Sequence, residues 1–216
     1  EHDLSRFPDE TILAWLASAP LAATPGSCAA YSDTDDFLLG LALETASGKP
    51  VRELLQREVF EPAGMGDSGW VAERSELVES AHLDQEFAGG ETELVHAPPP
   101  FEADLLHSTV LDLVRFQRAL LGDTLLNAAG RARRLAPARL IDGSTTSSAR
   151  GVDLTALGEL PRHAAGGGMA GQRVHIAYYP TMDTTFALLA RGPEAPVEAL
   201  ERSLARLLFD QQPAAP

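Results

Sequence analysis

The sequence predicts an α+β protein, in which a helical lobe is followed by an antiparallel β-sheet that a C-terminal helix covers. Residues 173–179 and 184–189 are rich in β-branched and aromatic residues and flank a Pro-Thr-Met-Asp turn, which predicts an antiparallel hairpin. Residues 197–209 carry leucines on one side at helical spacing, which predicts an amphipathic helix.

The same patterns predict the domain organisation. Helical spacing of apolar residues dominates the first part of the chain, strand-like alternation follows it, and no internal repeat interrupts either. We therefore expect one domain over residues 1–216. Residues 1–160 would form a mainly helical lobe, and residues 161–216 would form the sheet strands and the C-terminal helix.

Proline and glycine residues mark the helix boundaries in this lobe. Pro8 begins a first helix and Pro20 ends it. Ser32 and Asp35 are spaced as a capping pair for a second helix, and Gly48 lies where a left-handed helix end needs glycine. The remaining predictions are a helix from Pro50 to a turn at 64–66, a surface excursion at 71–107, a helix from Ser108, a helix at 127–140 and a loop at 143–151.

The composition excludes several classes of protein and site. The net charge of −14 would repel a phosphate backbone, so we expect no nucleic-acid partner. No run approaches the roughly 18 apolar residues that span a bilayer. Cys28 is the one cysteine, which excludes an internal disulfide and a cysteine metal cluster. The six histidines form no His-x-x-x-His pair, so we expect no metal site and no cofactor.

Four stretches together resemble one known family. Residues 25–40 read Pro-Gly, then Tyr-Ser-Asp, then Phe-Leu-Leu-Gly; residues 59–65 read Val-Phe-Glu-Pro-Ala-Gly-Met. Residues 108–116 read Ser-Thr-x-x-Asp-Leu-x-x-Phe, and residues 166–171 form a glycine-rich turn before a strand. In this order they resemble the serine β-lactamase, DD-peptidase and esterase superfamily of penicillin-recognising enzymes, class C β-lactamase-like. The resemblance implies a β-lactamase/transpeptidase-like fold without its N-terminal strands and its nucleophile helix.

The resemblance also implies a mechanism. In this family a serine forms an acyl-enzyme, a lysine three residues later assists it, and a tyrosine helps to transfer the proton. The position of that tyrosine falls on Tyr31. A phenol with a pKa near ~10 can act as a base only if adjacent cations lower that pKa. The alternative is that Tyr31 is a buried aromatic residue that anchors a helix start.

The chain departs from the family pattern at the nucleophile. Lys49 is the only lysine, and the residue three positions before it is Ala46, so no Ser-x-x-Lys motif is present. Asp33 stands where the family usually has asparagine, in a position that binds substrate. An ionised aspartate cannot donate a hydrogen bond to a substrate carbonyl group.

The third family motif, Lys/His-x-Gly, is also altered. Counting back from the glycine turn places its first residue at Ala165, and His163 precedes that position by two residues. We take His163 as a candidate catalytic residue, with an exposed loop histidine as the alternative. Gly166 and Gly167 are the candidate substrate-binding residues of the glycine turn.

Two other patterns have simpler interpretations. Gly166-x-Gly168-x-x-Gly171 matches the dinucleotide fingerprint, but a proline-containing loop precedes it and a strand follows, which is the wrong context. His175 alternates with apolar neighbours and is interpreted as an ordinary strand position.

These observations favour a serine acyl hydrolase or transferase that acts on a β-lactam, a D-Ala peptide or a small ester. Its serine and lysine would come from an N-terminal segment or a complementary chain, so we expect residues 1–216 not to work alone. Without that segment, several apolar faces would stay exposed, each forgoing roughly 1.5–3 kcal/mol of burial. The alternative is a catalytically inactive binding or scaffold domain.

Overall fold

The computed structural model describes residues 8–70, 106–169, 172–192 and 194–210, apart from the side chains of Asp33 and Met169. The excursion predicted at 71–107 lies outside the described residues, except for its last two positions.

Helices dominate the described part of residues 1–140, as predicted. Gly48 ends the second helix with a left-handed φ of 68°. Ser32 forms no side-chain cap there; the backbone N–H of Asp35 donates to the carbonyl oxygen of Ser32 at 3.0 Å. The last helix of this part is shorter than the predicted 127–140. The helices are α1 (Asp9–Ser18), α2 (Asp33–Ser47), α3 (Val51–Leu55), the π-helical turn η2 (Gln56–Phe60), α4 (Glu61–Ala63), α6 (Val110–Leu121) and α7 (Ala128–Arg134).

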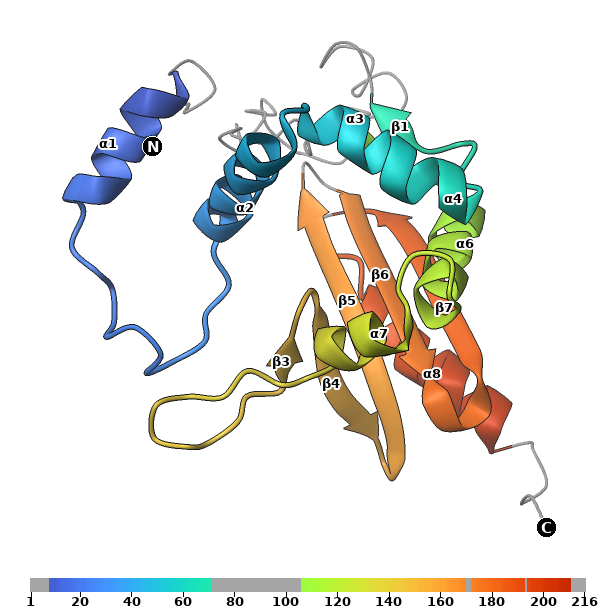
Figure 1. The fold of residues 1–216 in the computed structure, drawn as a ribbon. Helices are drawn as coiled ribbons and strands as arrows, with labels where there is room; N and C mark the ends of the chain where they lie inside the picture. Colours follow the sequence, from blue (N-terminus) through green and yellow to red (C-terminus); the bar gives the residue numbers. More distant parts are fainter. Residues whose placement is uncertain (1–7, 71–105, 170–171, 193, 211–216) are drawn as a thin grey trace, which may run out of the picture.

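A five-stranded antiparallel sheet follows, with strands in chain order across it (Figure 1). The predicted hairpin is confirmed, because its two strands pair along their whole length. The sheet starts earlier than residue 161, within the predicted loop 143–151, because Gly151 adopts a left-handed φ of 67° and permits a tight turn. The strands are β3 (Ser148–Ala149), β4 (Val152–Leu157), β5 (Leu160–Met169), β6 (Gln172–Tyr179) and β7 (Thr184–Arg191); a separate pair joins β1 (Gly69–Trp70) and β2 (Leu106–His107).

The glycine stretch differs from its prediction. The sequence predicts a turn at 166–171, yet Gly166, Gly167 and Gly168 all lie in β5 and pair with β6. A Cβ on Gly168 would lie 2.8 Å from the backbone oxygen of Gln172, so glycine permits a close approach of the two strands here. The segment before it is also strand rather than loop.

Helix α8 (Val197–Phe209) covers one face of the sheet, as predicted. Ala164 of β5 and Ala177 of β6 are paired and pack against Ala205 and Phe209 of α8. Because side chains alternate along a strand, the odd-numbered residues of β5 point to the opposite face. No helix in the described part of the chain is both long and apolar enough to cross a bilayer.

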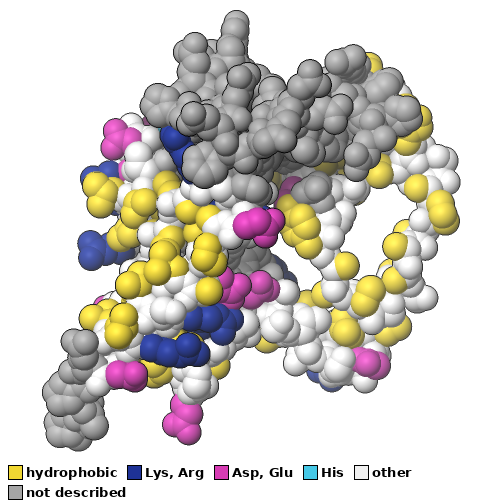
Figure 2. Space-filling model, turned by 180° about the vertical axis from the view of Figure 1, so that it is seen from behind, with side chains coloured by type: hydrophobic (Ala, Val, Ile, Leu, Met, Phe, Trp, Pro, Cys, Tyr) yellow, Lys and Arg dark blue, Asp and Glu magenta, His cyan; other side chains and the backbone are white. Residues whose placement is uncertain are grey.

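Several large apolar side chains stay on the surface. On α8 the exposed leucines follow one stripe beside the buried face, and Figure 2 shows apolar side chains gathered on this side of the molecule. The exposed stripe of α8 consists of Leu200, Leu204, Leu207 and Leu208, which are 40–62% exposed, and Leu189 of β7 is 44% exposed.

Candidate functional site

Tyr31 lies two residues before α2 and is 83% exposed. The interpretation of Tyr31 as a buried aromatic anchor is therefore wrong. Ser32 has an extended backbone, with a φ of −153° and a ψ of 122°, which brings the chain into the first turn of α2. The phenol thus stands at a helix entrance with its ring open to solvent.

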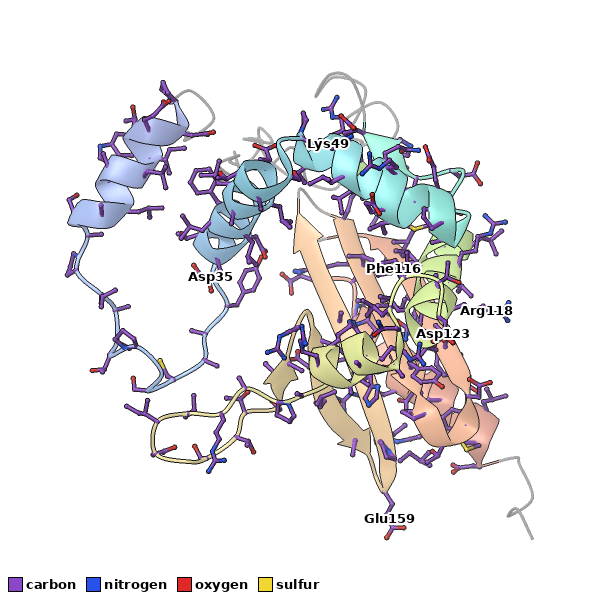
Figure 3. The ribbon with its side chains drawn as sticks, in the orientation of Figure 1. Asp35, Lys49, Phe116, Arg118, Asp123 and Glu159 are labelled. Atoms are coloured by element: carbon purple, nitrogen blue, oxygen red, sulfur yellow. The ribbon has the colours of Figure 1, made fainter. Side chains whose placement is uncertain are left out.

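Asp33 is the first residue of α2, and its side chain lies outside the described part of the structure. Lys49 is placed between α2 and α3, as Figure 3 shows. Its ammonium group pairs with the carboxylate of Glu53 one helical turn further on. The only lysine of the chain is thus committed to a surface ion pair.

Beyond Ala164, one edge of β5 pairs with no strand among the described residues. β4 pairs with β5 only as far as Ala164, which lies opposite Asp153. Residues 165–169 pair with β6 on one side, and no strand of the described chain lies on the other. Such an edge offers backbone N–H and C=O groups to an extended ligand.

The three glycines of β5 differ in the space around them. A Cβ on Gly166 would lie 2.8 Å from Nδ1 of His175, so this position is crowded. A Cβ on Gly167 would meet nothing within 4 Å. Gly167 therefore leaves the odd-numbered face of the strand clear beside its unpaired edge.

His163 lies on that same face of β5, not in a loop. It is half-buried, and its ring centroid lies 6.1 Å from that of Tyr178. Burial lowers the pKa of His163, and the positive charge of Arg134 on α7 lowers it further. The lowered pKa favours the neutral imidazole at neutral pH, two residues from Ala165.

A pocket of about 770 Å³ opens between β4, β5, β6 and the start of α8. Its walls include Gly166 and Gly167 but neither Tyr31 nor His163, so the pocket joins only part of the predicted site. Charged groups of both signs surround it, among them Arg173, Arg202 and Glu194.

Four polar side chains meet next to this pocket, where they are buried between the sheet and α8. Two of them, Arg162 and His175, also line the pocket. Arg162 donates to Oε2 of Glu201 through Nε at 3.0 Å and Nη2 at 2.7 Å. Tyr179 donates to Oε1 of Glu201 at 2.6 Å. Nε2 of His175 lies 3.0 Å from Nη2 of Arg162. This buried cluster of Arg162, His175, Tyr179 and Glu201 joins β5 and β6 to α8.

The cluster shifts the pKa of two of its members. Burial by itself raises the pKa of Glu201, but hydrogen bonds from His175, Arg162 and Tyr179 outweigh it and lower the pKa to about 2. Burial raises the pKa of Tyr179, and the hydrogen bond to Glu201 adds to that effect. Sequence reasoning missed this cluster, because Arg162 and Glu201 are far apart in the chain and His175 matched an ordinary strand position.

The Ser-Thr-x-x-Asp stretch has a structural role. Thr109 caps α6 by accepting from the backbone N–H of Asp112 at 3.2 Å. The buried Asp112 accepts from the backbone N–H of Asp67 at 2.8 Å and from the Ser68 hydroxyl at 2.7 Å. The motif thus ties α6 to the turn after α4.

These residues supply an exposed phenol, a free strand edge and a pocket. The described residues contain no group of three or more His, Cys, Asp or Glu side chains placed to hold a metal ion. Such a set can bind an extended ligand and move a proton.

Comparison with known proteins places these features in a family context. The family model described as Beta-lactamase matches residues 1–211. D-alanyl-D-alanine-carboxypeptidase/endopeptidase AmpH of Escherichia coli (strain K12) is 46% identical over 54 residues, which is 25% of this chain and 14% of that protein. Esterase EstB of Burkholderia gladioli is 40% identical over 74 residues, 34% of this chain and 19% of that protein. The chain thus matches less than a fifth of the length of these two relatives.

Solved structures share the fold. The D-amino acid amidase from Ochrobactrum anthropi SV3, complexed with L-phenylalanine, superposes with a TM-score of 0.70 at 18% identity over 98% of this chain and 67% of that chain. A penicillin binding protein from Bacillus halodurans gives a TM-score of 0.67 at 20% identity, over 93% and 61%. The helical lobe and the sheet therefore follow an architecture that is shared with solved structures of longer chains.

Proposed function

The chain belongs to the Beta-lactamase family, and from that membership we propose that it forms the tyrosine- and sheet-bearing part of a serine hydrolase. A segment outside residues 1–216, or a separate chain, would supply the nucleophilic serine and its lysine. The observation that carries the proposal is the exposure of Tyr31, at 83%, in the stretch that resembles the family's tyrosine motif.

Tyr31 would act as the general acid or base. Its phenol is open to an incoming group, as proton transfer requires. A phenol accepts a proton at neutral pH only beside cations that lower its pKa, and the missing lysine is the family's source of such a charge. The proposal thus accounts for the absence of a Ser-x-x-Lys motif from residues 1–216.

The substrate would lie along the unpaired edge of β5 at residues 165–169. Backbone groups there can hold an extended acyl chain, and the open space at Gly167 leaves room beside it. His163, with its lowered pKa, would flank the start of this edge segment, two residues before Ala165. We propose an acyl substrate such as a D-alanyl peptide, a small ester or a β-lactam, in line with the names of the similar proteins.

A second candidate function is a catalytically inactive binding domain. Ala165 stands where the third motif has lysine or histidine, and its side chain can neither donate a hydrogen bond nor carry charge. A domain that kept the free edge of β5 without the chemistry would bind extended ligands and release them unchanged.

A labelling experiment separates the two functions. The longest natural polypeptide that contains residues 1–216 is treated with a fluorescent penicillin and with an activated ester. We expect covalent labelling or turnover that falls on the order of 10²–10⁴-fold in Tyr31→Phe, because the general acid–base group is lost. Leu21→Ala is the control, since Leu21 is 76% exposed in the same connection. Absence of labelling and turnover in the unmodified protein would favour the binding domain.

A further inference from the structure

The connection that carries Tyr31 is tied to the sheet side of the molecule by a contact far from it in sequence. Residues 19–32 form no helix or strand, and α2 begins only two residues after Tyr31. The backbone N–H of Ile141 donates to the carbonyl oxygen of Gly26 at 3.0 Å. Gly26 lies five residues before Tyr31, so this bond holds the connection close to the phenol.

The contact requires glycine at position 26. Gly26 adopts a φ of +80°, which side-chain-bearing residues rarely tolerate. A Cβ there would lie 2.7 Å from Cγ2 of Ile141, well inside van der Waals contact. Ile141 is itself 70% exposed, so the contact adds little to the core. The contact therefore positions the connection at residue 26 more than it stabilises the core.

Ile141 sits at the tip of an ordered hairpin at residues 138–148. Arg139 and Thr145 form an antiparallel bridge across it. At the tip, Oδ1 of Asp142 accepts from the backbone N–H of Ser144 at 2.9 Å and from its hydroxyl at 2.7 Å. The hairpin leads directly into β3, which pairs with β4, and β4 pairs with β5. A continuous series of backbone contacts therefore runs from β5 to Gly26.

We propose that Gly26 and Ile141 are positioning residues that set the place of Tyr31 relative to the free edge of β5. Tyr31 and residues 165–169 come from separate elements, and a reacting group has to be placed within a fraction of an ångström to work. The hairpin transmits the position of the sheet to the connection that carries the phenol. The positioning role rests on the proposed function of Tyr31. The hydrogen bond between Ile141 and Gly26 does not depend on that function.

The test compares three variants in the polypeptide that contains residues 1–216. Gly26→Ala introduces both the clash with Ile141 and backbone strain. Gly26→Ala combined with Ile141→Ala removes the clash and keeps the strain. Gly64→Ala is the matched control, because Gly64 has a similar φ of +69° with open space around it and ends α4, outside the hairpin. The readouts are hydrogen exchange of the residue-141 amide and the pH titration of ¹³C-labelled Tyr31 by NMR, with acylation rates where the polypeptide has them.

We expect Gly26→Ala to speed exchange of the Ile141 amide by about tenfold or more and to move the Tyr31 titration. The double variant should recover part of both effects, and Gly64→Ala should change neither. Unchanged amide exchange and an unchanged Tyr31 titration in Gly26→Ala would overturn the proposal, as would equal effects in Gly64→Ala. Because the two NMR readouts need no activity, a polypeptide that lacks acylation would contradict the proposed function and still test the contact.

Discussion

At the residue scale, Glu201 makes buried polar contacts between α8 and the sheet. Its side chain has no exposed surface and is held by Arg162 and Tyr179. A buried carboxylate is stable only while these partners compensate its loss of hydration. Since its pKa falls from the ordinary 4.5 to about 2 on folding, the charged form stabilises the folded state above pH 4.5. That contribution is lost as the pH falls through the folded value.

We therefore predict an acid-sensitive stability. Between pH 5 and pH 2 this group should lower the free energy of unfolding by on the order of 3 kcal/mol, measured by urea denaturation at several pH values. Glu201→Gln should be less stable at pH 7, because the buried Arg162 loses its nearer counter-ion and keeps only the carboxylate of Glu198 at 3.4 Å, and it should lose less stability on acidification. Equal pH dependence in both proteins would contradict the assignment.

Tyr31, in contrast to Glu201, should matter for activity and not for stability. Because its ring is 83% exposed, we expect Tyr31→Phe to change the free energy of unfolding by less than about 0.5 kcal/mol while it lowers acylation. Thermal denaturation beside the labelling assay checks this. A marked loss of stability would indicate that the phenol has a structural role instead.

At the element scale, β5 combines a crowded face with an open one. Gly166 and Gly168 face close neighbours on β6, whereas Gly167 faces open space. Strand pairing with β6 therefore sets the requirement for glycine at Gly166 and Gly168 but not at Gly167. We propose that this division separates fold from binding within three consecutive residues.

A pair of alanine variants tests that division. Gly166→Ala should lower the free energy of unfolding by about 1–3 kcal/mol, because its Cβ meets His175 and the backbone oxygen of Val174. Gly167→Ala should be neutral within about 1 kcal/mol, since no neighbour lies within 4 Å. Differential scanning calorimetry gives both values. Similar destabilisation in the two variants would show that the faces of β5 are not distinct.

At the scale of the whole molecule, the main feature is an apolar surface that no described residue covers. β7 ends the sheet, and no described strand pairs with its outer edge. Beside it lies the exposed leucine stripe of α8, which includes Leu204 and Leu208. A surface of this kind marks an interaction site. We propose that the complementary segment covers it and supplies the serine and lysine.

Alanine substitution measures whether the stripe is covered. In residues 1–216 alone, Leu204→Ala should cost less than about 1 kcal/mol, because the side chain is 40% exposed. In a polypeptide that carries the complementary segment, the same change should cost about 2–5 kcal/mol, as for a buried leucine. Chemical denaturation of both polypeptides provides the comparison. Equal small costs would show that no segment covers α8.

Much of the fold could be predicted because its signals are local. The repeat of leucines gave the bounds of α8, and the alternation on both sides of Pro180 gave the hairpin of β6 and β7. The turn predicted at residues 166–171 is wrong for Gly166–Gly168. Glycine usually weakens a strand, unless another backbone approaches so closely that no side chain fits. That neighbour, β6, is visible only once the strands pair.

The sequence by itself determined the family pattern, the order of helices and strands, and the absence of a Ser-x-x-Lys motif, because these depend on residues close together in the chain. Only the tertiary structure decided that Tyr31 is exposed, that Arg162 and Glu201 form a buried pair, and that Ile141 holds Gly26. Burial and long-range contact depend on which surfaces meet after folding, and residues distant in the sequence carry no local signal of that meeting.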